Sequence, residues 1–107
     1  MKDFEIKAIA IRENTGDYAI NHLFTYSNFM TIEECYKQLY IWSHHYHYTI
    51  MQYVIKKGNQ VVEIETYVGA LGIDIIANDN HSTKHQLERL RLKLVKELKN
   101  KLGLENN

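Results

Sequence analysis

The stretch that decides the fold is Tyr46 to Val68, YHYTIMQYVIKKGNQVVEIETYV, the most continuous run of strand-forming residues in the chain. Valine, isoleucine, threonine and tyrosine favour a pleated, half-buried surface. Lys57-Gly58-Asn59 interrupts the run with residues that tolerate positive φ and favour a turn. The stretch therefore predicts a β-hairpin at the centre of the fold.

The second limb of this hairpin has a period of two. Its residues point alternately to two sides, with Val62, Ile64, Thr66 and Val68 on one side and Val61, Glu63, Glu65 and Tyr67 on the other. This alternation is typical of a sheet with one wet face. We therefore expect Glu63, Glu65 and Tyr67 on a free face of the sheet, together with one set of tyrosines from the first limb.

A second hairpin is predicted upstream. Phe4 to Ile11 and Tyr18 to Tyr26 both have strand patterns, and Asn14-Thr15-Gly16-Asp17 supplies the turn between them. Further along, Gly69 to Gly72 suggests a bend, and Ile73 to Ala77 reads as a short fifth strand. An unbroken continuation of the preceding strand is the competing interpretation.

Two amphipathic helices complete the pattern. Thr31 and Glu34 form a capping box for a helix from Thr31 to His44, and Thr83 with Gln86 forms another for a helix from Lys84 to Leu102. Gly103 ends the second helix. The sequence predicts an α+β fold in the order ββαβββα, with an antiparallel four- to five-stranded sheet and two helices packed on one face.

Composition favours a single cytoplasmic domain. The 107 residues are 45% hydrophobic and 24% charged, no apolar run is long enough to span a membrane, and the N-terminus lacks a signal-peptide pattern. The single cysteine, Cys35, agrees with a reducing compartment and is expected in the core. We expect one domain over 1–107, with 104–107 frayed.

The net charge gives no bulk attraction for nucleic acid or anionic lipid, since thirteen basic residues balance thirteen acidic ones.

Arg91 interrupts the apolar stripe of the second helix. The stripe otherwise comprises Leu87, Leu90, Leu94, Val95, Leu98 and Leu102. An arginine there needs a partner. Glu33, Glu34 and Asp74 are the expected mates, and an intermolecular contact is the alternative.

The catalytic and metal signals are weak. His44, His45 and His47 lie within four positions, but no zinc spacing accompanies them. His47-Tyr48-Thr49-Ile50-Met51 and His81-Ser82-Thr83 resemble the paired motifs of the 2H phosphoesterase family, although the second lacks the hydrophobic flank. Glycine-rich phosphate loops and nucleophile elbows are absent from the sequence. We therefore predict no catalytic, cofactor or metal residues.

The remaining hypothesis is a binding protein. Exposed tyrosines anchor protein partners or stack on unpaired bases, and the carboxylates beside Tyr67 favour a protein. We expect a small non-catalytic interaction protein. Its small size, and an amino-acid composition that low-GC codon usage favours, indicate a phage or mobile-element inhibitor of a host or defence protein. The alternative is a nucleic-acid-binding or regulatory module that uses the basic C-terminal helix face or the tyrosine-bearing sheet. The predicted partner-binding residues are Tyr67, Glu63, Glu65, Tyr53 and Arg91, and a homodimer through the C-terminal helix or an open sheet edge is a further expectation.

Overall fold

The structure is a computed structural model that describes residues 3–14, 17–66 and 81–104, with side chains described for 3–11, 30–66 and 86–104. Its elements in chain order are β1 (Phe4–Asn14), β2 (Asp17–Phe29), α1 (Ile32–Tyr40), the π-helical turn η1 (Ile41–His45), β3 (Thr49–Lys57), β4 (Gln60–Thr66) and α3 (His81–Leu102).

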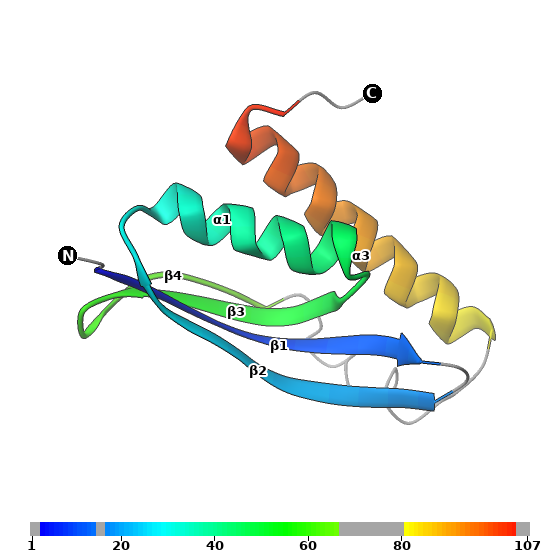
Figure 1. The fold of residues 1–107 in the computed structure, drawn as a ribbon. Coiled ribbons are helices and arrows are strands. Elements are labelled where there is room, and N and C mark those ends of the chain that lie inside the picture. The colour runs from blue at the N-terminus through cyan, green and yellow to red at the C-terminus, as the bar shows by residue number, and fades with distance from the viewer. Residues whose placement is uncertain (1–2, 15–16, 67–80, 105–107) are drawn as a thin grey trace.

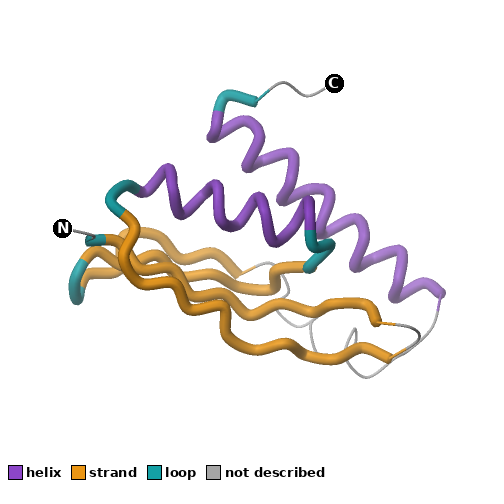
Figure 2. Tube along the Cα trace, in the orientation of Figure 1, coloured by secondary structure: helices purple, strands orange, loops and turns teal. Residues whose placement is uncertain are grey.

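The strands form one antiparallel sheet in the order β2-β1-β3-β4. Both helices lie on the same side of this sheet, so the molecule has two layers (Figures 1 and 2). Among the described residues, β4 forms one edge of the sheet and β2 the other. The predicted α+β class, with an antiparallel sheet and two helices, is confirmed.

The finer prediction of element order is not matched. The described elements run ββαββα, whereas the sequence predicted ββαβββα. The extra strand was placed at 73–77, which lies outside the described residues.

The core lies between the sheet and the helices. Its fully buried members come from β1, β3, α1, η1 and α3, and include Ile6, Ala8, Ala10, Cys35, Leu39, Trp42, Tyr53, Ile55, Leu94 and Leu98. Within the described residues, β4 contributes no side chain to this cluster or to the smaller one around Met51 and Leu87. The strand is therefore joined to the rest of the molecule by its pairing with β3 and by polar contacts.

The β3–β4 hairpin turns where the sequence predicted. Lys57 pairs with Gln60, which leaves Gly58 and Asn59 as the two-residue loop. Gly58 has a φ of 62°, and a glycine at the first loop position suits a hairpin turn because it lacks a Cβ. A register shift follows between Ile55 and Lys56, so β4 carries a bulge close to the turn.

Helix α1 begins as predicted and ends differently. The Thr31 hydroxyl accepts a hydrogen bond from the Glu34 backbone N–H at 3.2 Å and so caps the helix. After Tyr40 the helix widens into η1, and His47 with a φ of 58° precedes β3. Tyr46, which lies beyond the widened turn, is 57% exposed.

Helix α3 starts earlier than predicted and ends at the expected residue. It begins at His81, so Thr83 lies inside the helix instead of capping it. Gly103 has a φ of 72° and follows the last helical residue, Leu102, and the Leu104 N–H donates to the Lys99 carbonyl at 2.8 Å. In Figure 1 the C-terminal end of α3 rises away from the sheet.

Candidate functional site

The side of strand β4 that faces the helices is the opposite of the side that the sequence pattern predicted. Residues that face each other in an antiparallel pair project to the same side of the sheet. Glu63 lies opposite the fully buried Ile55, and Glu65 lies opposite Tyr53, which is 1% exposed. The carboxylates therefore project towards the helical layer, and Ile64, paired with Val54, projects to the outer face.

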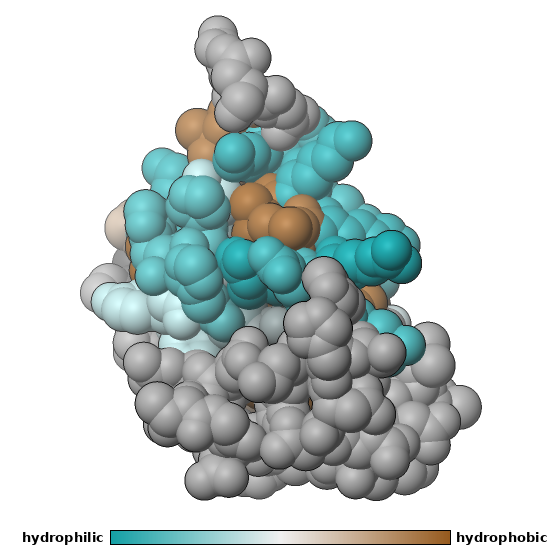
Figure 3. All heavy atoms as spheres, turned by 90° about the vertical axis from the view of Figure 1, so that its right-hand side faces the viewer, coloured by the Kyte–Doolittle hydropathy of each residue, from teal (hydrophilic) through white to brown (hydrophobic). Residues whose placement is uncertain are grey.

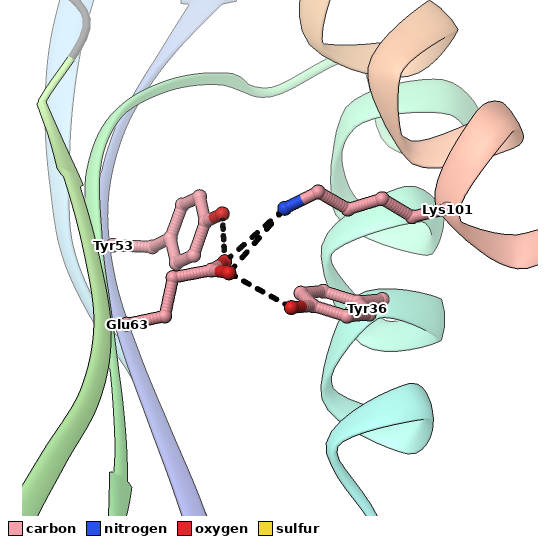
Figure 4. A network of polar contacts seen from close by, with 4 residues as sticks. All are labelled: Tyr36, Tyr53, Glu63 and Lys101. Carbon is pink, nitrogen blue, oxygen red and sulfur yellow. Dashed lines mark hydrogen bonds and ion pairs between the residues drawn. The ribbon is translucent and has the colours of Figure 1, made fainter.

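The Glu63 carboxylate is surrounded by three donors from three different elements (Figure 4). The Tyr36 hydroxyl of α1 donates to it at 2.8 Å, and the Tyr53 hydroxyl of β3 donates to its other oxygen. The Lys101 ammonium of α3 lies 3.4 Å from both oxygens. We call these four residues the Glu63 cluster.

The lysine of the cluster makes a second contact. Its ammonium lies 4.6 Å from the centroid of the Tyr36 ring, within the range of a cation–π interaction. Lys101 is in the last turn of α3, where the helix has already risen from the sheet, so its long side chain is needed to reach β4 (Figures 1 and 4). Three elements therefore converge on one carboxylate of the edge strand.

Electrostatics follow from this geometry. Burial alone would raise the pKa of Glu63, but the hydrogen bonds from Tyr53 and Tyr36 and the charge of Lys101 outweigh it, so the pKa lies below its ordinary value. Burial, followed by the hydrogen bond to Glu63, raises the pKa of Tyr36 to about 12. At neutral pH the cluster holds an ionised carboxylate and a neutral Tyr36 phenol.

The cluster has the chemistry of a structural attachment. Its two phenols and its ammonium all point to the same carboxylate, so they satisfy one another (Figure 4). Such a set of partners is typical of a polar group whose hydrogen bonds are satisfied within the fold. The arrangement joins β4 to α1 and α3. Among the described residues, the side chains of β4 do not reach these helices through apolar packing.

The outer side of β4 carries the apolar residues. Val61, Val62 and Ile64 are 50%, 45% and 54% exposed, and we call these three residues the outer β4 strip. Val54 of β3 lies beside Ile64 and is half-buried. Beyond it on β1, Lys7 pairs with Val54 and forms a 3.7 Å ion pair with Glu5. The strip is therefore bordered by charged side chains on the same face.

Two of the predicted partner-binding residues do not lie on a free face of the sheet. Tyr53 belongs to the buried core, and Glu63 lies under the helices, so the prediction of a free face that carries them is wrong. Glu65 is exposed at the helix-facing side of the edge, and Tyr67 lies outside the described residues. Sequence reasoning missed Tyr36 and Lys101, which have no feature that marks them as partners of a distant glutamate.

Arg91 has a partner of a kind that the sequence did not suggest. Its Nη1 donates to the backbone carbonyl of Ser43 at 3.0 Å. Ser43 is in η1, near the end of the helical segment, where carbonyl groups lack a following N–H. The arginine therefore joins α3 to the end of the α1–η1 segment. Of its predicted mates, Asp74 lies outside the described residues.

The histidines do not form a metal centre within the described part of the chain. Three or more histidine, cysteine or acidic side chains do not converge anywhere among those residues. His44 instead stacks on Tyr40, with ring centroids 5.0 Å apart and planes 19° apart. Cys35 is fully buried, and burial raises the pKa of its thiol to about 11, so the prediction of a core cysteine is confirmed.

The comparisons with known proteins found no relative of this chain. No family model matches the chain, and neither a curated protein nor a solved structure matches it. Among the described helices, none has both the length and the apolar character of a membrane span.

Proposed function

We propose that this chain is a small non-catalytic protein-binding protein whose contact surface is the outer β4 strip. The observation that carries the proposal is the reversed orientation of β4: three apolar side chains about half exposed at a sheet edge, with a carboxylate held inside. Exposed apolar residues bordered by charges are typical of protein contact sites. Edge strands also offer backbone groups to a partner.

A narrower proposal concerns the origin of the partner. Lysine outnumbers arginine ten to three, which AT-rich codons favour, and the chain has only 107 residues. These features support a phage or mobile-element product that blocks a host or defence protein by surface contact. A second copy of the chain is the other partner that this surface accommodates, and light scattering on the purified protein distinguishes the two.

The test is a pair of charge-introducing variants. Ile64→Lys changes the centre of the strip, and Leu92→Lys makes the same kind of change at a residue of α3 that is 49% exposed. A partner is captured with the wild-type protein, identified, purified and titrated against all three proteins. We expect Ile64→Lys to weaken binding at least about tenfold, since charges are disfavoured in interface centres, and Leu92→Lys to bind as the wild type does.

Two outcomes contradict the proposal. One is equal binding of the partner to the wild-type and Ile64→Lys proteins. The other is the absence of a partner and of self-association. Circular dichroism of each variant shows whether it is folded before it is titrated.

A further inference from the structure

A second surface lies at the end of the helical layer and is independent of the outer β4 strip. It combines aromatic rings from α1, η1 and the residue that follows them with cations from α3. Its members are Tyr40, His44, His45, Tyr46, Arg91 and Lys99, and we call it the ring-and-cation surface. Nothing in the Glu63 cluster or in the proposed protein contact uses these residues.

The rings of this surface are close together and differ in orientation. Tyr40 stacks on His44 with centroids 5.0 Å apart, and His45 meets both rings edge-on, 5.0 Å from His44 and 5.9 Å from Tyr40. Tyr46 follows His45 in the chain and is 57% exposed, and its ring lies 6.0 Å from the Tyr48 ring, tilted by 45°. The widened turn of η1 places these consecutive residues here, and such turns are frequent at functional sites.

Two basic side chains of α3, Arg91 and Lys99, lie near these rings. Arg91 is held against η1 by its 3.0 Å hydrogen bond to the Ser43 carbonyl. Burial first, and then interactions with His45, Lys99, Arg91 and His47, lower the pKa of His44. Further along α3, the exposed basic residues Lys96, Lys93 and Arg89 are interleaved with Glu88 and Glu97.

The helical half of this end of the molecule is largely hydrophilic, with small apolar areas among the polar atoms (Figure 3). This appearance does not suit an apolar protein interface, which depletes lysine at its centre. Rings beside cations are instead the combination that binds unpaired bases and their phosphates. The chain as a whole is neutral, so such binding depends on this local surface.

We infer that the ring-and-cation surface binds single-stranded nucleic acid, with a base stacked on Tyr46 and the backbone phosphates beside Lys99 and the basic side of α3. The single strand is favoured over a duplex because stacking on an exposed ring requires a base that is free of its own stack. The contact is sequence-tolerant, because every base offers an aromatic face.

The test uses a fluorescently labelled oligothymidine of about twelve nucleotides, within the range that one small domain covers. Fluorescence anisotropy is measured at low salt and at several higher salt concentrations, with a duplex of the same length as a comparison. We expect binding of the single strand that weakens as salt rises, and weaker binding of the duplex.

Three matched variants locate the contact. Tyr46→Ala should weaken binding about 5- to 100-fold, whereas Tyr46→Phe keeps the ring and should bind as the wild type does. Lys99→Ala should weaken binding and lower the slope of log affinity against log salt by about one. Lys7→Ala removes the same charge from the opposite face of the sheet and should leave affinity and slope unchanged.

The inference is overturned if the oligothymidine does not bind, or if Tyr46→Ala binds as tightly as Tyr46→Phe. It is also overturned if Tyr46→Ala reduces capture of a protein partner while the oligothymidine stays unbound, since the surface then serves a protein. None of these results depends on the outer β4 strip, so a failure here leaves the proposed protein contact untouched.

Discussion

At the residue scale, Glu63 shows how a carboxylate can stay ionised beneath a helical layer. Removing a charge from water is costly unless hydrogen bonds and an opposite charge compensate. Here two phenolic hydroxyls and one ammonium provide that compensation. The side chain of Glu63 remains 22% exposed and that of Lys101 38% exposed, which weakens the ion pair relative to a fully buried one.

The first residue-scale prediction concerns Glu63→Gln. The neutral amide accepts weaker hydrogen bonds and loses the attraction of Lys101, so the free energy of unfolding should fall by about 1 to 2 kcal/mol at pH 7. Because the pKa of Glu63 is lowered in the folded state, its contribution is present above the ordinary value of 4.5 and is lost as pH falls through the folded-state pKa. Urea unfolding of the wild-type and Glu63→Gln proteins between pH 7 and pH 3 measures this loss of unfolding free energy.

The two stability curves should therefore converge as the solution becomes acidic. Lys7→Met is a suitable control, since it removes a charge from the exposed Glu5–Lys7 pair and should change stability by less than about 0.5 kcal/mol. A difference between the wild-type and Glu63→Gln proteins that stays constant or grows towards acidic pH would mean that the carboxylate is not held by these donors.

At the element scale, β4 shows why a period of two does not by itself identify the inner face. Its pattern separates valines and isoleucine from glutamates, and the usual assignment puts the apolar set inside. The structure reverses it because Glu63 finds Tyr36, Tyr53 and Lys101 on the inner side. Those partners lie 10 to 38 positions away along the chain, so local patterning contains no sign of them.

The α1–η1 segment gives the second element-scale lesson. The Thr31 cap and the burial of Cys35 follow from local sequence, and the structure confirms both. The change to a π-helical turn does not follow from local sequence. At this end of the segment, Arg91 of α3 donates to the Ser43 carbonyl. An arginine within the apolar stripe indicates that it has a partner. It does not reveal that this partner is a backbone carbonyl.

Replacing that arginine tests the connection between the two helices. Arg91→Met keeps much of the apolar stem and leaves the Ser43 carbonyl without its donor, so unfolding stability should fall by about 1 to 3 kcal/mol. Amide hydrogen exchange should also accelerate at Tyr46 and Tyr48, whose N–H groups bond to carbonyls of η1. Arg89→Met, on the exposed face of the same helix, is the matched control and should have little effect on either quantity. Unchanged exchange at both amides in Arg91→Met would contradict the connection.

At the scale of the whole molecule, sequence reasoning was sufficient for the class of fold and insufficient for its surfaces. Hairpins, caps and amphipathic stripes are local features, and they predicted β1 to β4, the start of α1 and the end of α3. Which face of the edge strand is covered depends on contacts between distant segments. The expectation that Tyr53 and Glu63 lie on a free face of the sheet was wrong for that reason.

The two proposed surfaces lie on different layers of the molecule. The outer β4 strip lies on the sheet face away from the helices, and the ring-and-cation surface lies at the end of the helical layer. A single substitution can therefore alter one without the other. This separation makes the protein-binding and nucleic-acid-binding tests independent of one another.

The free energy of unfolding of Ile64→Thr, measured by urea titration of the isolated protein, tests the orientation of β4 most directly. The substitution keeps the branched Cβ that suits a strand and replaces apolar surface with a hydroxyl group. If Ile64 faces solvent, stability should change by less than about 0.5 kcal/mol. A loss of about 2 kcal/mol or more would match a buried isoleucine and would contradict an outward-facing strip.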